Sequence, residues 1–466
     1  MQLGDILEDL ALDVATASLE ITRVDSDSRQ CEPGSLFFAM PGRVNNGSAF
    51  ARDAVARGAM CVVAAEPLPG MVVPVLRVPS TQLHTLCSHA SAAVSRNPEL
   101  RTQLVGVTGT NGKTTVTTLV AALARNLGWN GANIGTLTNE RTTPDSPELF
   151  RTLATLVDRF DDRAGRSVVA MEVSSHAIDQ HRIEGLRFTV AAFTNLSHDH
   201  LDYHGTMEEY FVAKARLFTP EHAQRAVIWA DDPYGERLAE LTSLPVTRVS
   251  RSDASDVQTT LRGTTYFWRD HIINTPLIGD YNVDNALLAM TVLSVLGASD
   301  ADIAHAMGDV ASVPGRFELV GGGQFTVIVD YAHTPAGLAR LLADVRDMMT
   351  GGHLITVFGC GGDRDREKRP EMGTVATSAS DITIVTSDNP RSESPDDIID
   401  DIMTGVLPGA SAYRLSDRRG AITRAFELAA PGDVVVLAGK GHETTQTIAG
   451  EVLPFDDRAV AKELLK

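Results

Sequence analysis

Short apolar runs alternate with helix-like stretches from the start of the chain. In the first hundred residues the apolar runs are SLFFAM (35–40), MCVVAAE (60–66) and VVPVLRV (72–78). The stretch SRNPEL (95–100) that follows is a predicted linker, because proline disfavours helix in the residue before it. The pattern therefore predicts a first structural unit that ends near residue 100.

The same alternation continues in the middle of the chain. Residues 103–128 read as a strand, a glycine-rich turn and a long helix. Further strand-like runs are SVVAMEVS (167–174), FTVAAFTNLS (188–197) and AVIWADD (226–232), with helical patterns between them. Strands that alternate with helices predict a mainly parallel sheet covered by helices.

A second break falls at SVPGRFE (312–318), after which the strand-like runs begin again. They are FTVIVDYA (325–332), HLITVFG (353–359), DITIVTSD (381–388) and DVVVLAGKG (433–441). Polar loops follow each of these runs. In open α/β sheets the ligands bind at the carboxyl ends of the strands, so these loops are candidates for a binding site.

The length agrees with more than one domain. A chain of 466 residues suggests three domains at roughly 150 residues each. We therefore predict an α/β protein with three domains, at 1–100, 101–312 and 313–466.

The composition narrows the class of protein. The chain is 43% hydrophobic and 22% charged, which is typical of globular proteins. A net charge of −19 argues against duplex DNA or an anionic membrane as the main partner. The acidic N-terminus is not a secretory signal, and no apolar run reaches the roughly 18 residues of a membrane span. The four cysteines, which have no CxxC spacing, indicate reduced thiols; we expect a soluble, cytoplasmic protein.

A glycine-rich turn between the first central strand and its helix predicts a phosphate site. Its glycines let backbone N–H groups approach a phosphate, and the helix N-terminus favours negative charge. Lys113 is expected to pair with the β and γ phosphates, and the Thr114 hydroxyl to bind Mg²⁺. The usual pattern has glycine where this chain has Val107, so a tight turn with a chance lysine is the alternative. The candidates are Gly109, Thr110, Asn111, Gly112, Lys113, Thr114 and Thr115.

Two further features leave alternatives open. His198, Asp199, His200, Asp202 and His204 lie within seven residues and suit either a zinc site or one loop of mixed hydrogen bonds.

Lys214, in EYFVAKARLF (209–218), is the second of these features. A surface lysine on a helix is the commoner case. Its apolar flanks would instead lower the pKa of the amine and keep the amine neutral.

The loop DNPR (388–391) follows the strand-like run DITIV. Asp388, Asn389 and Arg391 lie on a turn that Pro390 fixes, which suits a polar, planar ligand group. The alternative is a surface ion pair between Arg391 and Glu393.

Many short motifs together resemble one known family, the Mur ligase and folylpolyglutamate synthase superfamily. Within it the chain is similar to the ligases that add the third residue of the peptidoglycan stem peptide. The motifs, in chain order, are DSR (27–29), TGTNGKTT (108–115), TTP (142–144), MEVSSHAIDQHR (171–182), NLSHDHLDYHGTMEEYFVAKARLF (195–218), GDYNVDNALLA (279–289), VPGRFE (313–318), VDYAHTP (329–335), GCGGDRDREKRP (359–370), DNPR (388–391) and AGKGHE (438–443). Each motif is weak alone, but their joint order and spacing is specific.

The resemblance implies an activity. It implies an N-terminal domain for the UDP part of a substrate, a central P-loop ATPase domain with a parallel-type sheet, and a Rossmann-like C-terminal domain for an amino acid. The implied enzyme is an ATP-dependent acid–amino-acid ligase that forms ADP and phosphate. It would act in peptidoglycan synthesis in the cytoplasm, and so in cell wall biogenesis, cell shape, cell division and the cell cycle. Its implied substrates are UDP-MurNAc-L-Ala-D-Glu and meso-diaminopimelate. Nucleic acid and membrane insertion play no part, and a monomer is expected.

The resemblance also assigns the metal and catalytic residues. Thr114 and Glu172 are implied ligands of one Mg²⁺, and His200 of a second, although Mg²⁺ prefers oxygen. Lys214 is implied to carry a CO₂-derived carbamate, which would offer Mg²⁺ an anionic oxygen. Arg316, at the second break, would reach the γ-phosphate when the domains close. The implied catalytic set is Lys113, Glu172, His200, Lys214 and Arg316.

Other residues are assigned to the nucleotide. Asn282 and Asn285 could contact adenine or cap the following helix; we expect a nucleotide contact for Asn282 and capping for Asn285. Asp330 ends a strand and would hold the ribose hydroxyls, and His333 would be structural.

The UDP-linked substrate has its own implied contacts in the first two domains. Arg182 can pair bidentately with a carboxylate or phosphate. The implied contacts are Ser26, Ser28, Arg43, Val44, Asn45, Thr142, Thr143, Ser174, Gln180 and Arg182.

The implied amino-acid pocket suits diaminopimelate. Two arginines suit its distal carboxylate through bidentate bonds, and Glu443 with the Gly439 carbonyl suits its ammonium. L-Lysine lacks that carboxylate and would leave Arg391 without a partner, which is costly when the charge is buried. The implied residues are Arg364, Asp388, Asn389, Pro390, Arg391, Gly439 and Glu443.

Three alternatives remain. They are an L-lysine-adding enzyme of the same family, another Mur or folylpolyglutamate-type ligase, and a regulatory nucleotide-binding protein without ligase activity.

Overall fold

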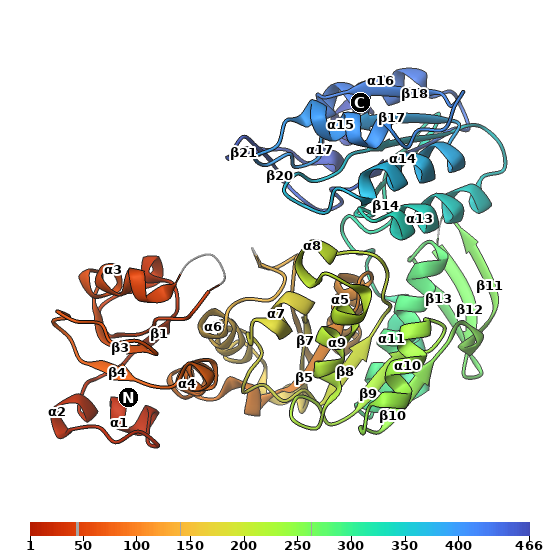
Figure 1. Ribbon diagram of the computed structural model, residues 1–466. Helices are drawn as coiled ribbons and strands as arrows, with labels where there is room; N and C mark the ends of the chain where they lie inside the picture. The colour runs from red at the N-terminus through yellow and green to blue at the C-terminus, as the bar shows by residue number, and fades with distance from the viewer. Residues whose placement is uncertain (43–45, 140, 262) are drawn as a thin grey trace.

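The computed structural model describes residues 1–42, 46–139, 141–261 and 263–466. Strands and helices alternate into α/β units, as the hydrophobic pattern predicts. In Figure 1 the N-terminal hundred residues, in red and orange, lie to one side of the central unit, and the blue C-terminal unit lies above it. No helix in the described parts of the chain is long and apolar enough to cross a membrane.

The N-terminal unit contains a small parallel sheet. Its strands run in the order β1 (Arg23–Asp25), β2 (Ser35–Phe38), β3 (Ala59–Ala64) and β4 (Val75–Arg77). Helix α4 (Ser80–Val94) packs on this sheet and leads to the central unit.

The central unit is a six-stranded parallel sheet in the order β10-β9-β8-β5-β7-β6. The strands are β5 (Gln103–Thr108), β6 (Asn130–Ile134), β7 (Ser167–Glu172), β8 (Val190–Phe193), β9 (Ala226–Trp229) and β10 (Val246–Val249). Because helices cover both faces, successive residues of one strand are buried on opposite sides. In β5, Leu104 joins the core under α6 (Ser146–Val157) and α9 (Met207–Ala215).

The opposite face of this sheet is covered by two long helices. Val105 and Val107 of β5 pack in the core beneath α5 (Lys113–Asn126) and α11 (Asp280–Val295). Both helices begin at the carboxyl edge of the sheet region, where the phosphate loop lies.

A three-stranded antiparallel sheet, which the pattern did not predict, precedes α11. It consists of β11 (Ala254–Thr260), β12 (Gly263–Trp268) and β13 (His271–Thr275). Tyr266 and Trp268 of β12 point into the central core, whereas Phe267 between them is exposed. This period of two is the signature of a half-buried strand.

The C-terminal unit has a six-stranded sheet in the order β14-β15-β19-β16-β17-β18, parallel except for the edge strand β14. The strands are β14 (Glu318–Gly322), β15 (Thr326–Asp330), β16 (Leu354–Phe358), β17 (Ile382–Thr386), β18 (Ala412–Leu415) and β19 (Val434–Ala438). One face is covered by α13 (Pro335–Met348), α14 (Lys368–Ala379) and α15 (Pro395–Met403), and the other by α16 (Arg418–Leu428) and α17 (Asp457–Leu464). The hairpin β20 (Thr445–Ile448) and β21 (Glu451–Pro454) follows β19.

Polar contacts join the three units. Arg151 of α6 donates to the Val24 carbonyl and to Asp25 in the N-terminal unit, at 2.7 and 3.1 Å. Arg316, just before β14, donates to the Thr114 hydroxyl of α5 at 3.0 Å. The sheets lie within the three predicted ranges, and the domain bounds themselves stay a prediction.

Candidate active site

The phosphate loop lies between β5 and α5. Gly109 and Gly112 have φ values of +147° and +86°, a backbone region that L-residues with side chains rarely adopt. Side chains would also not fit: a Cβ at Gly109 would collide with Thr194, and one at Gly112 with Asn285. The loop is therefore tightly packed, although Val107 stands where the usual phosphate-loop pattern has its first glycine. The N-terminus of the 14-residue helix α5 follows it directly.

Two lysines converge on one carbonyl of this loop. Lys113 Nζ donates to the Gly109 and Thr110 carbonyls at 2.9 and 2.7 Å, and Lys214 Nζ donates to the Gly109 carbonyl at 2.8 Å. In the described chain neither ammonium has a carboxylate within ion-pair distance. Two lysine amino groups beside the N-terminus of a helix favour the binding of an anion here.

Lys214 is not a surface lysine. It is 1% exposed and lies over the Tyr210 ring, 4.6 Å from its centroid. Burial, and then the charge of Lys113, hold the pKa of Lys214 well below its usual value. A lowered pKa favours the neutral amine, which is the form that reacts with CO₂. The burial of Lys214 therefore supports the interpretation as a neutral amine with a lowered pKa over that as a surface lysine.

A hydroxyl and a carboxylate meet opposite the lysines. Thr114 Oγ1 donates to Glu172 Oε2 at 3.0 Å, and the Thr136 backbone N–H donates to Glu172 Oε1 at 2.8 Å. Arg316 reaches Thr114 from the C-terminal unit. Hydroxyl and carboxylate oxygens are the ligands that Mg²⁺ prefers, so this pair fits the implied metal.

His200 lies beside a buried carboxylate. It has a left-handed backbone, with φ +56°, and its Nε2 is 3.5 Å from Asp199 Oδ2. Burial lowers the pKa of His200 to about 3, although Asp199 opposes this, so the imidazole is neutral and can act as a ligand. Asp199 also faces His333 and Lys368 of the C-terminal unit, at 3.9 and 3.6 Å.

The histidine-rich loop does not form a zinc site by itself. Among the described residues its side chains diverge: His204 Nε2 lies 2.9 Å from the Ser175 hydroxyl, and His198 turns to Asp365. Of the two alternatives for this loop, mixed hydrogen bonds fit its residues better than a zinc site made by the loop alone.

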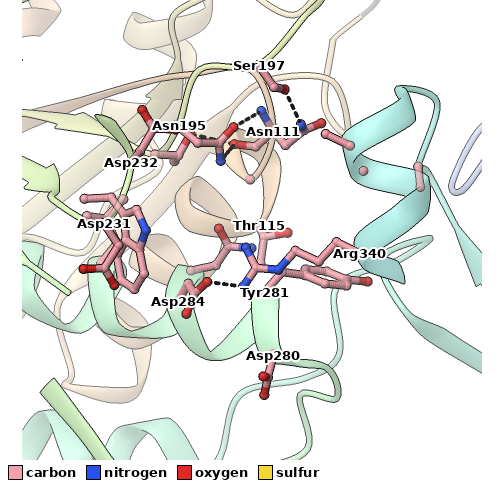
Figure 2. A pocket seen from close by; sticks show the side chains of 18 of the residues that line it. Asn111, Thr115, Asn195, Ser197, Asp231, Asp232, Asp280, Tyr281, Asp284 and Arg340 are labelled. Carbon is pink, nitrogen blue, oxygen red and sulfur yellow. Dashed lines mark hydrogen bonds and ion pairs between the residues drawn. The ribbon is translucent and has the colours of Figure 1, made fainter. Parts of the chain in front are cut away.

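A cavity of about 500 Å³ opens beside the phosphate loop, between the central and C-terminal units. Figure 2 shows Asn111, Asn195 and Ser197 on one side, joined by hydrogen bonds, and Arg340 with Asp284 on the other. Most of its lining was not predicted. The cavity is lined by Asn111, Gly112, Thr115, Thr194, Asn195, Leu196, Ser197, Trp229, Asp231, Asp232, Pro233, Arg251, Asp280, Tyr281, Asp284, Asn285, Leu288, Arg316, Asp330, Tyr331, Ala332, Ala336, Gly337 and Arg340.

The two asparagines of α11 have different positions from those expected. The helix begins at Asp280 after Gly279, so Asn285 lies in its second turn and does not cap it; the expected capping role is wrong. Asn285 lines the cavity and touches the phosphate loop at Gly112. Asn282 is buried, donates to the Ile278 carbonyl at 2.7 Å and is not among the lining residues. A nucleotide contact for Asn282 stays a prediction.

Asp330 lies at the edge of the cavity with three protein donors. Its Oδ2 accepts from the Tyr281 hydroxyl and the Phe317 N–H, at 2.9 and 2.7 Å, and its Oδ1 from the Ala332 N–H at 2.7 Å. Burial raises the pKa of this carboxyl group, although the Arg316 charge opposes it. Asp330 thus also fixes the junction to the C-terminal unit.

Four of the residues expected at the UDP-linked substrate, Thr143, Ser174, Gln180 and Arg182, form a hydrogen-bonded group within the central unit. Arg182 donates to the Thr143 carbonyl at 2.9 Å and to Gln180 at 2.6 Å. The Ser174 hydroxyl accepts from Ala177 N and caps a short helix, α7 (Ser175–Asp179). Thr142 lies 3.3 Å from the Thr136 hydroxyl.

A smaller cavity of about 110 Å³ lies nearby. It is lined by Ser26, Asp27, Arg29, Gln30, Arg141, Asp145, Pro147, Glu148 and Arg151. Ser28 is buried behind it in a short helix. Arg43, Val44 and Asn45 lie outside the described residues.

The loops after β17 and β19 form a second site, which we call the charged pocket: Asn389, Arg391, Lys440 and Glu443. Asn389 Nδ2 donates to Glu443 Oε2 at 2.7 Å, and Lys440 Nζ lies 3.0 Å from the same oxygen. Lys440 is fully buried, whereas the side chain of Glu443 is 29% exposed. The Glu443 carboxylate is thus held on its buried side by Lys440 and is partly exposed to solvent on its other side. Lys440 was not predicted as a site residue.

Arg391 forms the other side of the charged pocket. Its backbone has φ +53°, and its NH1 donates to the Gly362 carbonyl at 2.6 Å. Burial, and then the nearby charge of Arg364, lower the pKa of Arg391. The carboxylates of Asp388, Glu443 and Asp363 oppose this shift, so Arg391 lies among charges of both signs.

The remaining residues predicted here lie behind the pocket. Gly439 has φ +108°, and a Cβ there would come within 2.6 Å of Asp388 Oδ2. Asp388 and Pro390 are buried, and burial raises the pKa of Asp388 despite the Lys440 charge.

Two buried arginines hold these loops in place. Arg418 donates to Asp457 at 2.8 and 2.7 Å and to the Ser387 and Ala438 carbonyls, so it joins the ends of β17 and β19. Arg369 pairs with Glu393 at 2.7 Å and with Asp401 at 2.9 Å. Glu393 therefore pairs with Arg369, and the surface pair with Arg391 that the sequence left open is not formed.

Family models match almost the whole chain. The Mur ligase family catalytic domain matches residues 20–105, the Mur ligase middle domain 107–293, and the Mur ligase glutamate ligase domain 315–441. Each match corresponds to one of the three units described above.

Individual relatives match over their full lengths. UDP-N-acetylmuramoyl-L-alanyl-D-glutamate--2,6-diaminopimelate ligases from Gloeobacter violaceus and Aquifex aeolicus are 43% and 39% identical. These matches cover 100% and 98% of this chain, and 98% and 96% of the relatives.

Solved structures agree with the sequence matches. One structure of a ligase with the same name has a TM-score of 0.68 and 30% identity, and covers 100% of this chain and 98% of its own. The MurF ligase from Thermotoga maritima in complex with ADP has a TM-score of 0.65 over 96% of both chains, and at 18% identity it supports the fold alone. With its motifs, its three units and relatives of this identity, the chain belongs to the Mur ligase family.

Proposed function

We propose that this protein is the ATP-dependent ligase that joins meso-diaminopimelate to UDP-MurNAc-L-Ala-D-Glu in peptidoglycan precursor synthesis. The two relatives described above carry the name of that activity. The reaction forms an amide bond and releases ADP and phosphate. We place it in the cytoplasm and expect a monomer with domains at 1–100, 101–312 and 313–466.

The observation that carries the proposal is the arrangement of charge in the charged pocket. The charges of the partly exposed Glu443 carboxylate and of the Arg364 guanidinium both act on Arg391. Diaminopimelate has an ammonium and a carboxylate at its far end, and each would meet the opposite charge. L-Lysine would leave the half-buried Arg391 without a carboxylate partner, and an unpaired charge in a partly desolvated site is costly.

The first chemical step needs two anions to meet. The terminal carboxylate of the UDP-linked substrate attacks the γ-phosphorus of ATP, and ADP leaves as the acyl phosphate forms. Lys113, Arg316 and the phosphate loop would hold the phosphates in line and neutralise them. The nucleotide would fill the cavity of about 500 Å³, with Asp330 near the ribose.

The second step is attack by the amine of diaminopimelate on the acyl phosphate. The tetrahedral intermediate that results expels phosphate and leaves the amide. The charged pocket would fix the far end of the amino acid, so that its reacting amine points to the central unit. Asp388, Pro390 and Gly439 would shape the loops behind it.

Thr114, Glu172 and His200 would hold Mg²⁺, with Lys214 as a carbamate. The bound ions would supply charge neutralisation at the phosphates. Carbamate formation on the neutral Lys214 amine would place an anionic group beside Lys113.

The UDP-linked substrate would lie between the first two units. Ser26 at the smaller cavity, with Thr142, Thr143, Ser174, Gln180 and Arg182, would contact it. Arg182 already has three protein acceptors, including Asp145 at 3.0 Å, so a substrate anion would displace or share them.

The test is phosphate release from ATP with UDP-MurNAc-L-Ala-D-Glu and one of three acceptors: meso-diaminopimelate, L-lysine or L-ornithine. We expect release to depend on diaminopimelate and to be low with the other two. Equal release with lysine would favour the lysine-adding alternative. Release that needs none of the three would contradict the proposed function.

A further inference from the structure

His198, the first residue of the HDHLDYH loop, is not used by the proposed reaction. His198 precedes Asp199 and His200, but its ring contacts the C-terminal unit. Its Nε2 lies 3.1 Å from Asp365 Oδ2, on the loop that leads into α14. The contact therefore joins two separate units of the chain.

The two facing atoms are buried but make no hydrogen bond. His198 Nε2 and Asp365 Oδ2 are both closed to solvent, and neither has a hydrogen-bond partner of acceptable geometry. Asp365 as a whole is only 9% exposed. Buried polar atoms in native proteins are almost always satisfied, so this pair calls for a ligand beside it that contacts both atoms.

A third ligating group completes the cluster. One ligand atom from each of His198, Asp365 and Glu367 lies within 4.8 Å of the others. Asp365 Oδ1 accepts from the Glu367 backbone N–H at 2.9 Å, which fixes the two carboxylates relative to each other. We call these three residues the interdomain triad.

The cations near the interdomain triad have other partners. Arg366 pairs with Asp401 at 2.9 Å, Arg369 with Glu393 at 2.7 Å, and Lys368 with Asp199 at 3.6 Å. Among the described residues no lysine or arginine forms an ion pair with Asp365 or Glu367. Two carboxylates and one imidazole thus share a small space without a counter-charge.

We propose that the interdomain triad binds one divalent transition-metal ion of the Zn²⁺ type, separate from the Mg²⁺ that accompanies ATP. An imidazole nitrogen with two carboxylate oxygens suits Zn²⁺, Co²⁺ or Mn²⁺, whereas Mg²⁺ and Ca²⁺ prefer oxygen alone. A ligand spacing of 3.1 Å fits two neighbouring positions around a tetrahedral ion. Water would fill the fourth position.

The ion would restrain the movement of two units. His198 belongs to the central unit, and Asp365 and Glu367 belong to the C-terminal unit, so all three can bind only when the units lie as they do here. Bound metal would therefore hold this arrangement. Loss of a ligand from either unit should weaken binding in the same way.

The experiment is a Co²⁺ titration of the full-length protein in a large excess of Mg²⁺, which occupies the oxygen-rich sites. Visible d–d absorption reports a bound Co²⁺, and added Zn²⁺ should abolish it. We compare wild type with His198→Gln and Glu367→Gln. The matched controls are His89→Gln and Glu371→Gln, which change exposed residues of the same types outside the triad.

We expect one equivalent of Co²⁺ in wild type and in both controls, and binding at least ~10-fold weaker in His198→Gln and in Glu367→Gln. Glu367 is exposed, so its variant gives a result even if the His198 variant folds poorly. Equal binding by all five proteins would overturn the proposal. So would a signal that survives in His198→Gln but disappears in Glu172→Gln, because that result places the ion at the phosphate loop.

Discussion

The phosphate loop and the charged pocket both lie at the carboxyl ends of parallel strands, but they handle charge in opposite ways. At the phosphate loop, Lys113 and Lys214 converge on the Gly109 carbonyl without a carboxylate partner in the described chain. In the charged pocket, Lys440 and Asn389 already hold Glu443. At the phosphate loop the lysines have no direct carboxylate partner, whereas in the charged pocket the lysine and the carboxylate are already paired.

The difference matches the ligands that each site would take. A nucleoside triphosphate brings several negative charges. Lysines without a carboxylate partner gain the most favourable interaction energy when such an anion binds. Diaminopimelate brings one charge of each sign at each end, so it is recognised by the positions of these charges. For such a ligand the protein must hold each of its own charged side chains in a fixed place. Buried ion pairs such as Arg418 with Asp457 hold the loops that carry these side chains.

Lys214→Ala tests the phosphate-loop site and should have the largest effect. We expect turnover to fall by ~10³-fold or more, because the proposed carbamate ligand of the Mg²⁺ at the reacting phosphates is lost. A short-chain carboxylate should restore part of the rate. The measurement is phosphate release, with ¹³C NMR after ¹³C-bicarbonate addition to detect the carbamate in wild type. Full activity in Lys214→Ala would remove the carbamate from the mechanism.

Arg418→Met tests whether the charged pocket depends on its buried support. The variant leaves Asp457 buried without a partner and frees two loop carbonyls. Unpaired buried charges cost about 3–5 kcal/mol, so the C-terminal unit should unfold at clearly lower urea concentration.

The matched control for this test is the double variant Arg418→Met/Asp457→Leu, which removes both charges and should recover much of the stability. Equal stability of wild type and Arg418→Met would contradict the role of the pair.

Arg391→Ala tests recognition by position within the charged pocket. It removes a donor to the distal carboxylate, and hydrogen bonds to charged groups contribute about 1.5–3 kcal/mol. We expect KM for diaminopimelate to rise about 10- to 100-fold, and KM for ATP to change little. The control is Arg366→Ala, an exposed arginine that pairs with Asp401. Equal effects on both KM values would refute the pocket assignment.

Much of this organisation could be predicted from the chain because it is local. The glycine-rich turn, its lysine and the helix after it are consecutive residues, and their fold follows from their order. The apolar runs of the parallel strands are equally local, and so are the polar residues at their ends, such as Asp330 and Asp388.

The features that were missed depend on distant parts of the chain. Asn285 was expected to cap α11, but one turn of helical register decides which asparagine faces the loop at Gly112. Lys440 became a pocket residue only because β17 and β19 lie on either side of β16 in the folded sheet. Its contact to Asn389 spans 51 residues, and no local pattern encodes such a distance.

Glu393→Gln tests the smallest part of the comparison, the ion pair that ties the Arg391 loop to α14. Arg369 holds the pKa of Glu393 at about 2, below its usual 4.5. A lowered carboxyl pKa adds stability that is full above pH 4.5 and disappears as the pH falls toward 2. Because Asp401 still pairs with Arg369, we expect Glu393→Gln to cost only about 1 kcal/mol at neutral pH. The difference from wild type should vanish in urea unfolding near pH 2. A difference that persists at that pH would mean that packing, rather than charge, joins the loop to the helix.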